Sequence, residues 1–167
     1  MQVYHEIQPD ELGSALQNGL MRADRGEKSN DLSIVKTDHF LDEHCPERLK
    51  ELGVKRTSTI YAYLRVGDSI VDIVDGARRA VYDFIASSKQ IVLELDIDPN
   101  RCFVSDLDTY DAVKSALSNH ENQQVLDTLA RSYWSKIRPL SEFEPSMVQR
   151  PEAMITYDIP ASSLRRV

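Results

Sequence analysis

The sequence contains few glycines and few cysteines, and it has no long hydrophobic run. Of its 167 residues, 6 are glycine and 2 are cysteine. The glycine-rich loops GxGxxG and GxxxxGK, which cradle phosphates, do not occur. Cys45 and Cys102 alone form neither a disulfide framework nor a four-ligand zinc site. No apolar run reaches the roughly 18 residues of a membrane-spanning helix, and the N-terminus does not resemble a signal peptide, so we expect a cytoplasmic protein without a membrane partner.

The chain is acidic, and the excess of acids is concentrated in two stretches. It has 20 Lys and Arg against 27 Asp and Glu, a net charge of −7. Residues 1–40 hold seven acids and four bases, and residues 91–120 hold six acids and two bases. This charge argues against a protein that coats nucleic acid through bulk electrostatics. The length predicts one domain over residues 1–167, with enough residues for a hydrophobic core.

The hydrophobic pattern predicts an α+β domain without the regular strand–helix alternation of a doubly wound parallel sheet. A polar loop is expected over 21–36, with a short strand at 33–36. The segments with apolar alternation or β-branched residues predict strands at 2–7, 59–65, 70–74, 90–97, 102–104 and 152–159. Helical spacing and capping residues predict helices at 9–19, 38–52, 77–87, 106–118 and 121–136.

Dense acidic pairs suggest a metal site, but their spacing does not support one. A calcium loop that began at Asp106 would need glycine at its sixth position and glutamate at its twelfth, where the chain has Asp111 and Leu117. No HExxH or GxSxG motif is present, and Cys45 beside His44 reads as a structural thiol. We therefore expect no metal and interpret these acids as turn residues and helix caps.

Patterns with functional content lie at the two ends of the chain. They are VYHEIQPDELGSALQNGL near the start and RPEAMITYDIPASSL near the finish. Together these strings resemble the ADP-ribosyltransferase superfamily, in which a "YH" or "HG" strand precedes a helix ending in "GL" and a late strand carries a glutamate. The similarity is to the His–Tyr–Glu branch, which includes poly-ADP-ribose polymerases and toxins that modify DNA bases. It covers about the first 25 and the last 18 residues.

The resemblance implies a split mixed β-sheet with peripheral helices and a glycosyltransferase activity. The chain would transfer a single ADP-ribose from NAD, its substrate, to a nucleic-acid or protein acceptor, as a toxin-like enzyme. Glu152 would stabilise the oxocarbenium ion that forms as nicotinamide leaves. Tyr4 and His5 would form the cofactor-binding motif of the first strand, with His5 on a ribose hydroxyl.

Four further residues are candidates for cofactor binding by the same resemblance. Tyr61 or Tyr63 would stack on the nicotinamide ring, and we expect only one of the two to face the cofactor. Arg22 or Arg25 would contact the pyrophosphate, because a guanidinium matches phosphate oxygens.

Two alternatives stay open at this point. Gln149 lies three residues before Glu152, so the Gln-x-Glu pattern of arginine-modifying members is missing. An RNA 2′-phosphotransferase would share the fold and use one histidine and several arginines in place of the glutamate. A non-catalytic binding module, such as an antitoxin or immunity partner, would use the acidic stretch 91–120 as its interaction surface.

Overall fold

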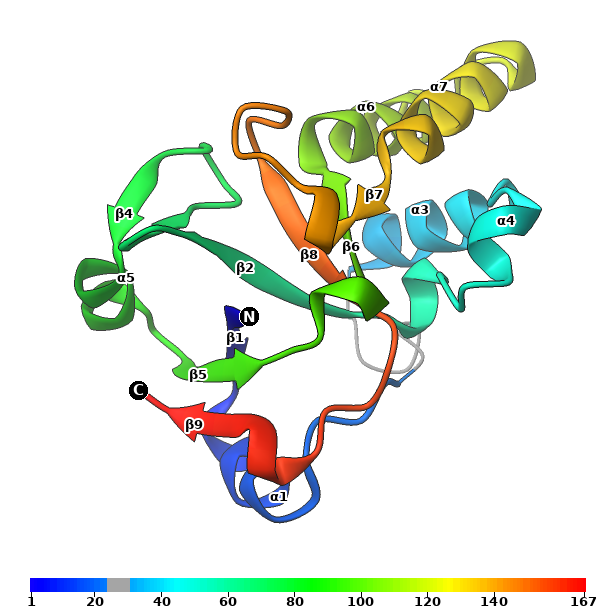
Figure 1. The fold of residues 1–167 in the computed structure, drawn as a ribbon. Coiled ribbons are helices and arrows are strands. Elements are labelled where there is room, and N and C mark those ends of the chain that lie inside the picture. The colour runs from blue at the N-terminus through cyan, green and yellow to red at the C-terminus, as the bar shows by residue number, and fades with distance from the viewer. Residues whose placement is uncertain (24–30) are drawn as a thin grey trace.

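A computed structural model describes residues 1–23 and 31–167, which form an antiparallel sheet with helices on both faces (Figure 1). The strands are β1 (Gln2–Ile7), β2 (Ile60–Val66), β3 (Ser69–Val71), β4 (Arg78–Ala80), β5 (Ile91–Asp96), β6 (Cys102–Asp106), β7 (Arg138–Pro139), β8 (Pro151–Ile155) and β9 (Leu164–Arg166). The helices are α1 (Leu12–Asn18), α3 (Leu32–Glu43), α4 (Glu47–Lys50), α5 (Val81–Ser87), α6 (Leu107–Ser118) and α7 (Gln123–Lys136). Among the described residues, no helix has the length and apolarity needed to cross a membrane.

The sheet order is β7-β6-β8-β2-β1-β5-β9, with β3 and β4 extending from β2. The α+β prediction is therefore confirmed. The prediction that the sheet mixes parallel and antiparallel strands is wrong, because every strand pairing in the described residues is antiparallel. The order places the N-terminal strand β1 inside the sheet, with only β2 between it and the late strand β8.

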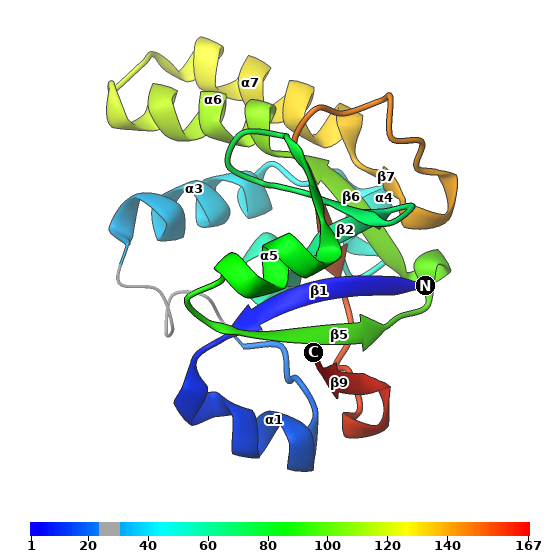
Figure 2. The same cartoon turned by 90° about the vertical axis from the view of Figure 1, so that its left-hand side faces the viewer.

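The contact between β1 and β2 is short. β1 pairs with β5 along its whole length, from Gln2 to Ile7, and Figure 2 shows the two strands side by side. With β2 it pairs only at Val3 and Tyr4. The ladder stops there although both strands continue. Two half-sheets, β7-β6-β8-β2 and β1-β5-β9, are thus joined by a ladder of two residue pairs.

Each face of the sheet has its own apolar core. On one face, aliphatic residues from β1, β2, β5, β6 and β8 pack with α1 and Ile159. On the other face, α3, α6 and α7 cover β6 and β8 (Figure 1), and α5 with the β3–β4 hairpin covers the β1 end. The indole N–H of Trp134 in α7 donates to the carbonyl of Leu41 in α3 at 2.9 Å, which ties these two helices together.

The strand predicted at 33–36 is wrong, and so are the bounds of the helix predicted over 38–52. Helix α3 begins at Leu32, and the Asp31 carboxylate caps it by accepting the Ser33 N–H at 2.9 Å. The β-branched residues 34, 35 and 37 concealed this helix, since they favour strands in isolation. The single helix expected over 38–52 is interrupted before Pro46, whose ring cannot continue a helical hydrogen-bond ladder.

Besides the two-residue strand β7, two short strands were also missed. Gly76, with φ +73°, turns the chain back so that β4 pairs with β3, and helix α5 therefore starts at Val81 instead of 77. At the C-terminus, β8 ends at Ile155, and β9 forms as a new edge strand on β5. Both strands are three residues long and depend on a partner strand, which local sequence patterns do not reveal.

Gly19 lies where a segment near the N-terminus contacts a segment near the C-terminus. It ends α1 with φ +87°, and a Cβ at this position would overlap the carbonyl oxygen of Ile159. Leu20 and Ile159 exchange two main-chain hydrogen bonds of 2.9 Å beside it.

We predict that Gly19→Ala lowers the free energy of unfolding by at least about 2 kcal/mol, because it adds backbone strain and a steric overlap. Gly13→Ala in the same helix is the matched control, since no atom lies within 4 Å of its added Cβ. The control should be neutral or stabilising by up to about 1 kcal/mol. Urea denaturation of both variants measures the difference, and equal stabilities would contradict this role for Gly19.

Candidate functional site

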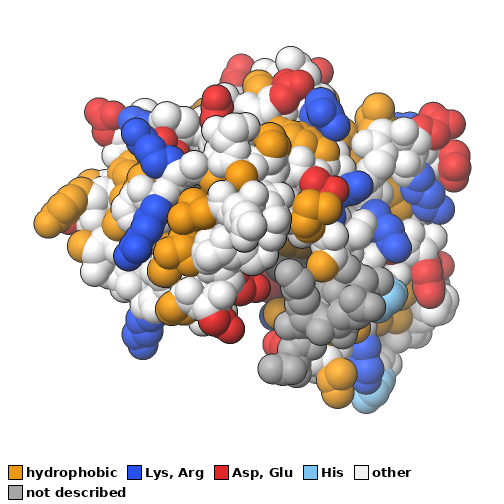
Figure 3. All heavy atoms as spheres, turned by 90° about the horizontal axis from the view of Figure 1, so that it is seen from below, with side chains coloured by type: hydrophobic (Ala, Val, Ile, Leu, Met, Phe, Trp, Pro, Cys, Tyr) orange, Lys and Arg blue, Asp and Glu red, His pale blue; other side chains and the backbone are white. Residues whose placement is uncertain are grey.

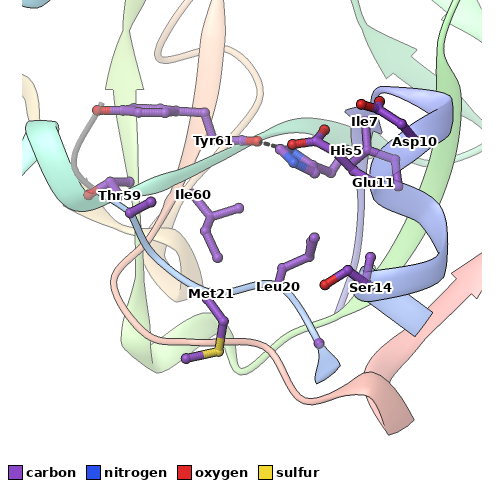
Figure 4. A pocket seen from close by; sticks show the side chains of 13 residues that line it. His5, Ile7, Asp10, Glu11, Ser14, Leu20, Met21, Thr59, Ile60 and Tyr61 are labelled. Carbon is purple, nitrogen blue, oxygen red and sulfur yellow. Dashed lines mark hydrogen bonds between the residues drawn. The ribbon is translucent and has the colours of Figure 1, made fainter. Parts of the chain in front are cut away.

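A cleft of about 600 Å³ opens where β1 and β2 separate. His5 and Ile7 of β1 form one side, and Thr59, Ile60 and the main chain of Tyr61 form the other (Figure 4). The segment after α1, with Leu20 and Met21, closes the lower side of the cleft in this view. The cleft is therefore built from both sides of the division in the sheet.

The His5 imidazole bridges the gap between the two strands. Its Nδ1 lies 2.6 Å from the Tyr61 carbonyl oxygen, shown as the dashed line in Figure 4. A carbonyl only accepts, so Nδ1 is the donor in this hydrogen bond. This bond fixes the orientation of the ring.

The rim of the cleft is acidic on the α1 side. Asp10 and Glu11, in the turn that precedes α1, line it together with the Ser14 hydroxyl. The Glu11 carboxylate also accepts the Gln8 N–H at 3.0 Å, which holds it in place. Carboxylates on one side of the cleft favour a ligand that presents positive charge or hydroxyl groups there.

Glu152 lies on the other face of the sheet and is 6% exposed. It pairs in register with Tyr63 on one side and with Ser105 on the other, and Tyr63 pairs with Tyr4. His5 follows Tyr4 in its strand and therefore belongs to the opposite face. His5 and Glu152 are thus two strands apart and on opposite faces, and Glu152 does not line the His5 cleft.

The Glu152 carboxylate belongs to a buried polar cluster centred on Arg56. Oε2 accepts from the Ser105 hydroxyl at 3.3 Å and lies 3.5 Å from Nη2 of Arg56. Nε of Arg56 donates to Asp38 at 2.8 Å, and Nη1 donates to the Tyr133 hydroxyl. Burial alone would lower the pKa of this guanidinium, but the surrounding phenols and the two carboxylates raise it well above its ordinary value. Arg56 is therefore a permanent cation inside the domain.

Aromatic rings complete the surroundings of Arg56. Its guanidinium carbon lies 4.2 Å from the centroid of Tyr110, 4.7 Å from that of Tyr61 and 5.5 Å from that of Tyr133. Cation–π attraction is strongest when the ion is desolvated, as it is here. Sequence analysis missed this cluster, because Arg56 stands in a polar run, and nothing in that run distinguishes it from the exposed Lys55.

The three candidate tyrosines have other partners. Tyr4 is buried and donates to Glu94 at 3.0 Å. Tyr63 donates to Glu6 at 2.8 Å, and burial followed by this bond raises its pKa. The expectation that only one of Tyr61 and Tyr63 can face a cofactor is wrong, because residues two apart in a strand share a face. Figure 4 shows the Tyr61 carbonyl turned toward His5 and its ring pointing away from the cleft.

Only one of the two candidate arginines can be placed. Nε of Arg22 lies 3.5 Å from Asp158, and the Arg22 N–H donates to the same carboxylate at 2.7 Å. The side chain lines a second pocket beside the His5 cleft. Arg25 lies outside the described residues.

The acidic stretch 91–120 consists largely of buried strands and paired carboxylates. Asp106 caps α6 and forms an ion pair with Lys136 at 2.6 Å. Asp108 and Asp111 both contact Arg150, at 3.0 and 2.8 Å. Within residues 1–23 and 31–167, no group of three or more His, Cys, Asp or Glu side chains is arranged to hold a metal ion.

Neither cysteine has the properties of a nucleophile. Burial raises the pKa of both Cys45 and Cys102 to about 11. Both are therefore neutral thiols at pH 7, and a thiol must be ionised to attack.

Asp38→Asn tests the buried cluster. It removes one of the two carboxylates that balance Arg56, and losing a partner of a buried charge costs about 3–5 kcal/mol. We expect the free energy of unfolding to fall by that amount in chemical denaturation. Asp68→Asn is the control, because Asp68 is fully exposed in its pair with Arg65, and this variant should match the wild type. Equal stability of the two variants would refute the central role of the cluster.

Searches with this chain against protein-family models, curated proteins and solved structures found no match.

Proposed function

We propose that this protein is an NAD⁺-dependent mono-ADP-ribosyltransferase that modifies a nucleic-acid or protein acceptor. The observation that carries the proposal is the divided sheet. It opens a cleft beside His5 of β1 and places β8, with Glu152, next to β2 on the other side of the division. These two residues are 147 positions apart in the sequence, yet only β2 separates their strands.

The His5 cleft has the size and polarity for part of a dinucleotide. Its volume of about 600 Å³ falls in the usual range of small-molecule sites. The His5 imidazole, oriented by its bond to the Tyr61 carbonyl, would hydrogen-bond a ribose hydroxyl. The acidic rim at Asp10 and Glu11 would favour the positively charged nicotinamide ring of NAD⁺.

Glu152 would supply the negative charge that the reaction needs. Cleavage of the bond between ribose and nicotinamide develops positive charge on the sugar, and a fixed carboxylate next to it lowers the barrier. Arg56 and Ser105 hold this carboxylate in one position. Because Glu152 and His5 lie on opposite faces, the proposal requires the cofactor to extend through the gap between β1 and β2.

A non-catalytic binding module is the second candidate, and one observation favours it. Glu152 is buried and forms an ion pair with Arg56, as expected for a carboxylate whose role is to balance a buried cation. Two measurements separate the candidates, namely the melting temperature with millimolar NAD⁺ and the release of nicotinamide. Ligand binding raises the melting temperature by mass action, and only a transferase also releases nicotinamide.

Glu152→Gln tests the catalytic role. We expect it to bind NAD⁺ as the wild type does and to release nicotinamide about 10²–10⁴-fold more slowly, because the amide keeps the shape of the side chain without its charge. Circular dichroism and a melting curve verify that the variant is folded at the assay temperature.

Two controls complete this test. Glu142→Gln removes an exposed carboxylate and should leave turnover unchanged. Asp38→Asn perturbs the same Arg56 cluster without removing the Glu152 carboxylate, so it reports the effect of disturbing the cluster. Wild-type turnover by folded Glu152→Gln protein would exclude Glu152 from catalysis.

His5→Ala tests the binding role. Loss of one hydrogen bond to a ribose hydroxyl should raise KM for NAD⁺ about tenfold, with a smaller effect on kcat. His39→Ala, at an exposed position of α3, is the matched control and should not change KM. An unchanged KM in the His5 variant would remove this residue from the site.

A further inference from the structure

A second pocket, of about 420 Å³, lies beside the His5 cleft. The side chains of Cys45 and Val54 are buried below it, between the C-terminal end of α3 and the turn after α4. Arg22, Lys50 and Lys55 also line the pocket. Three cationic side chains from three separate segments therefore surround one largely apolar pocket.

Among the described residues, one carboxylate lines this pocket, and it accepts three hydrogen bonds from the following turn. Oδ1 of Asp42 accepts the Arg56 N–H at 2.6 Å. Its Oδ2 accepts the N–H and the hydroxyl of Thr57, at 3.1 and 2.8 Å. Asp42 thus fixes the turn that carries Lys55 and has little capacity left for the cations around the pocket.

The lysines of the pocket are weakly paired. In the part of the chain that the structure describes, the ion pair of Lys50 is with the exposed Glu47, at 4.0 Å, and Lys55 has none. Other cations of this acidic protein are more tightly held, such as Lys136 at 2.6 Å from Asp106. Figure 3 shows both basic and acidic side chains on the face seen from below. Among the described residues, three cations and one carboxylate line the pocket, and this excess of positive charge in a chain of net charge −7 points to an anionic ligand.

We propose that this second pocket binds the phosphoryl groups of a nucleotide. Two ammonium groups and a guanidinium can donate charge-assisted hydrogen bonds to phosphate oxygens, and the Ser58 hydroxyl lines the same pocket. The aliphatic stems of the lysines and the apolar atoms of Cys45 and Val54 would contact the ribose or base. Asp158 holds Arg22 at the edge of the pocket, and the Arg22 side chain stays 35% exposed.

The two pockets share their boundary. Met21 and Ala23 line the His5 cleft, while Arg22, between them, lines the second pocket. Likewise, Thr59 lines the His5 cleft and the neighbouring Ser58 lines the second pocket. The phosphates could therefore belong to a dinucleotide in the His5 cleft or to a separate phosphate ester. The inference rests on the charges of the pocket and does not depend on transferase activity.

Titration calorimetry with inorganic pyrophosphate at low ionic strength tests the site. We expect saturable binding to the wild-type protein that weakens as sodium chloride is raised, because salt screens exposed charges. The double variant Lys50→Ala/Lys55→Ala should bind at least about tenfold more weakly, and Arg22→Ala should also bind more weakly. Lys89→Ala, an exposed lysine outside both pockets, is the matched control and should bind as the wild type does.

Titration of the same variants with NAD⁺ identifies the source of the phosphate. Weaker binding of both ligands by the double variant would assign the pocket to the diphosphate of the dinucleotide. Loss of pyrophosphate binding alone would assign it to a separate phosphate ester. No pyrophosphate binding by the wild type, or equal binding by the double variant and Lys89→Ala, would overturn the proposal. None of these measurements requires catalytic turnover, so their outcome is independent of the test of Glu152.

Discussion

The buried charge of Arg56 is the interaction on which this domain depends. A guanidinium that is 1% exposed must be balanced inside the protein, since an unpaired buried charge costs several kcal/mol. Its partners come from different parts of the chain, namely Asp38 in α3, Tyr133 in α7 and Glu152 in β8. The position of one side chain therefore fixes two helices against the face of the sheet. The aromatic rings around it also exclude water, which strengthens each of these contacts.

This constraint means that the structural role of Glu152 and its proposed catalytic role must be separated experimentally. As a partner of Arg56 it contributes to folding, and in the proposed reaction it would stabilise the oxocarbenium ion. The two roles are compatible, because Arg56 and Ser105 hold the carboxylate in one position. They differ in what happens when the charge is removed. A structural role predicts lower stability with normal turnover of the folded fraction, whereas a catalytic role predicts folded protein that does not turn over.

The parts of the fold that the sequence predicts are those encoded by local patterns. Strand β1, strand β5 and helices α6 and α7 have clear periodicity and, for the helices, a capping Asp106 or Asn122. The parts that it does not predict depend on distant partners. Residues 32–37 have strand-like composition but form a helix, because α3 packs against α6 and η2, the 3-10 turn Arg56–Ser58. The same holds for the polar residues: His5 lies in a strand that the sequence predicts, while Arg56 becomes distinctive only when α3, α7 and β8 surround it.

The division of the sheet explains why a polar cleft forms at His5. Where β1 and β2 separate, the main-chain groups that would have paired must find other partners, since buried amides and carbonyls are rarely left unpaired. The carbonyl of Tyr61 accepts a hydrogen bond from Nδ1 of His5, so a side chain replaces the strand as its partner. A ligand with an amide and hydroxyl groups can do the same for other groups along the gap, and nicotinamide riboside has both. The short β1–β2 ladder therefore provides the opening for a ligand and also the main-chain polarity to bind one.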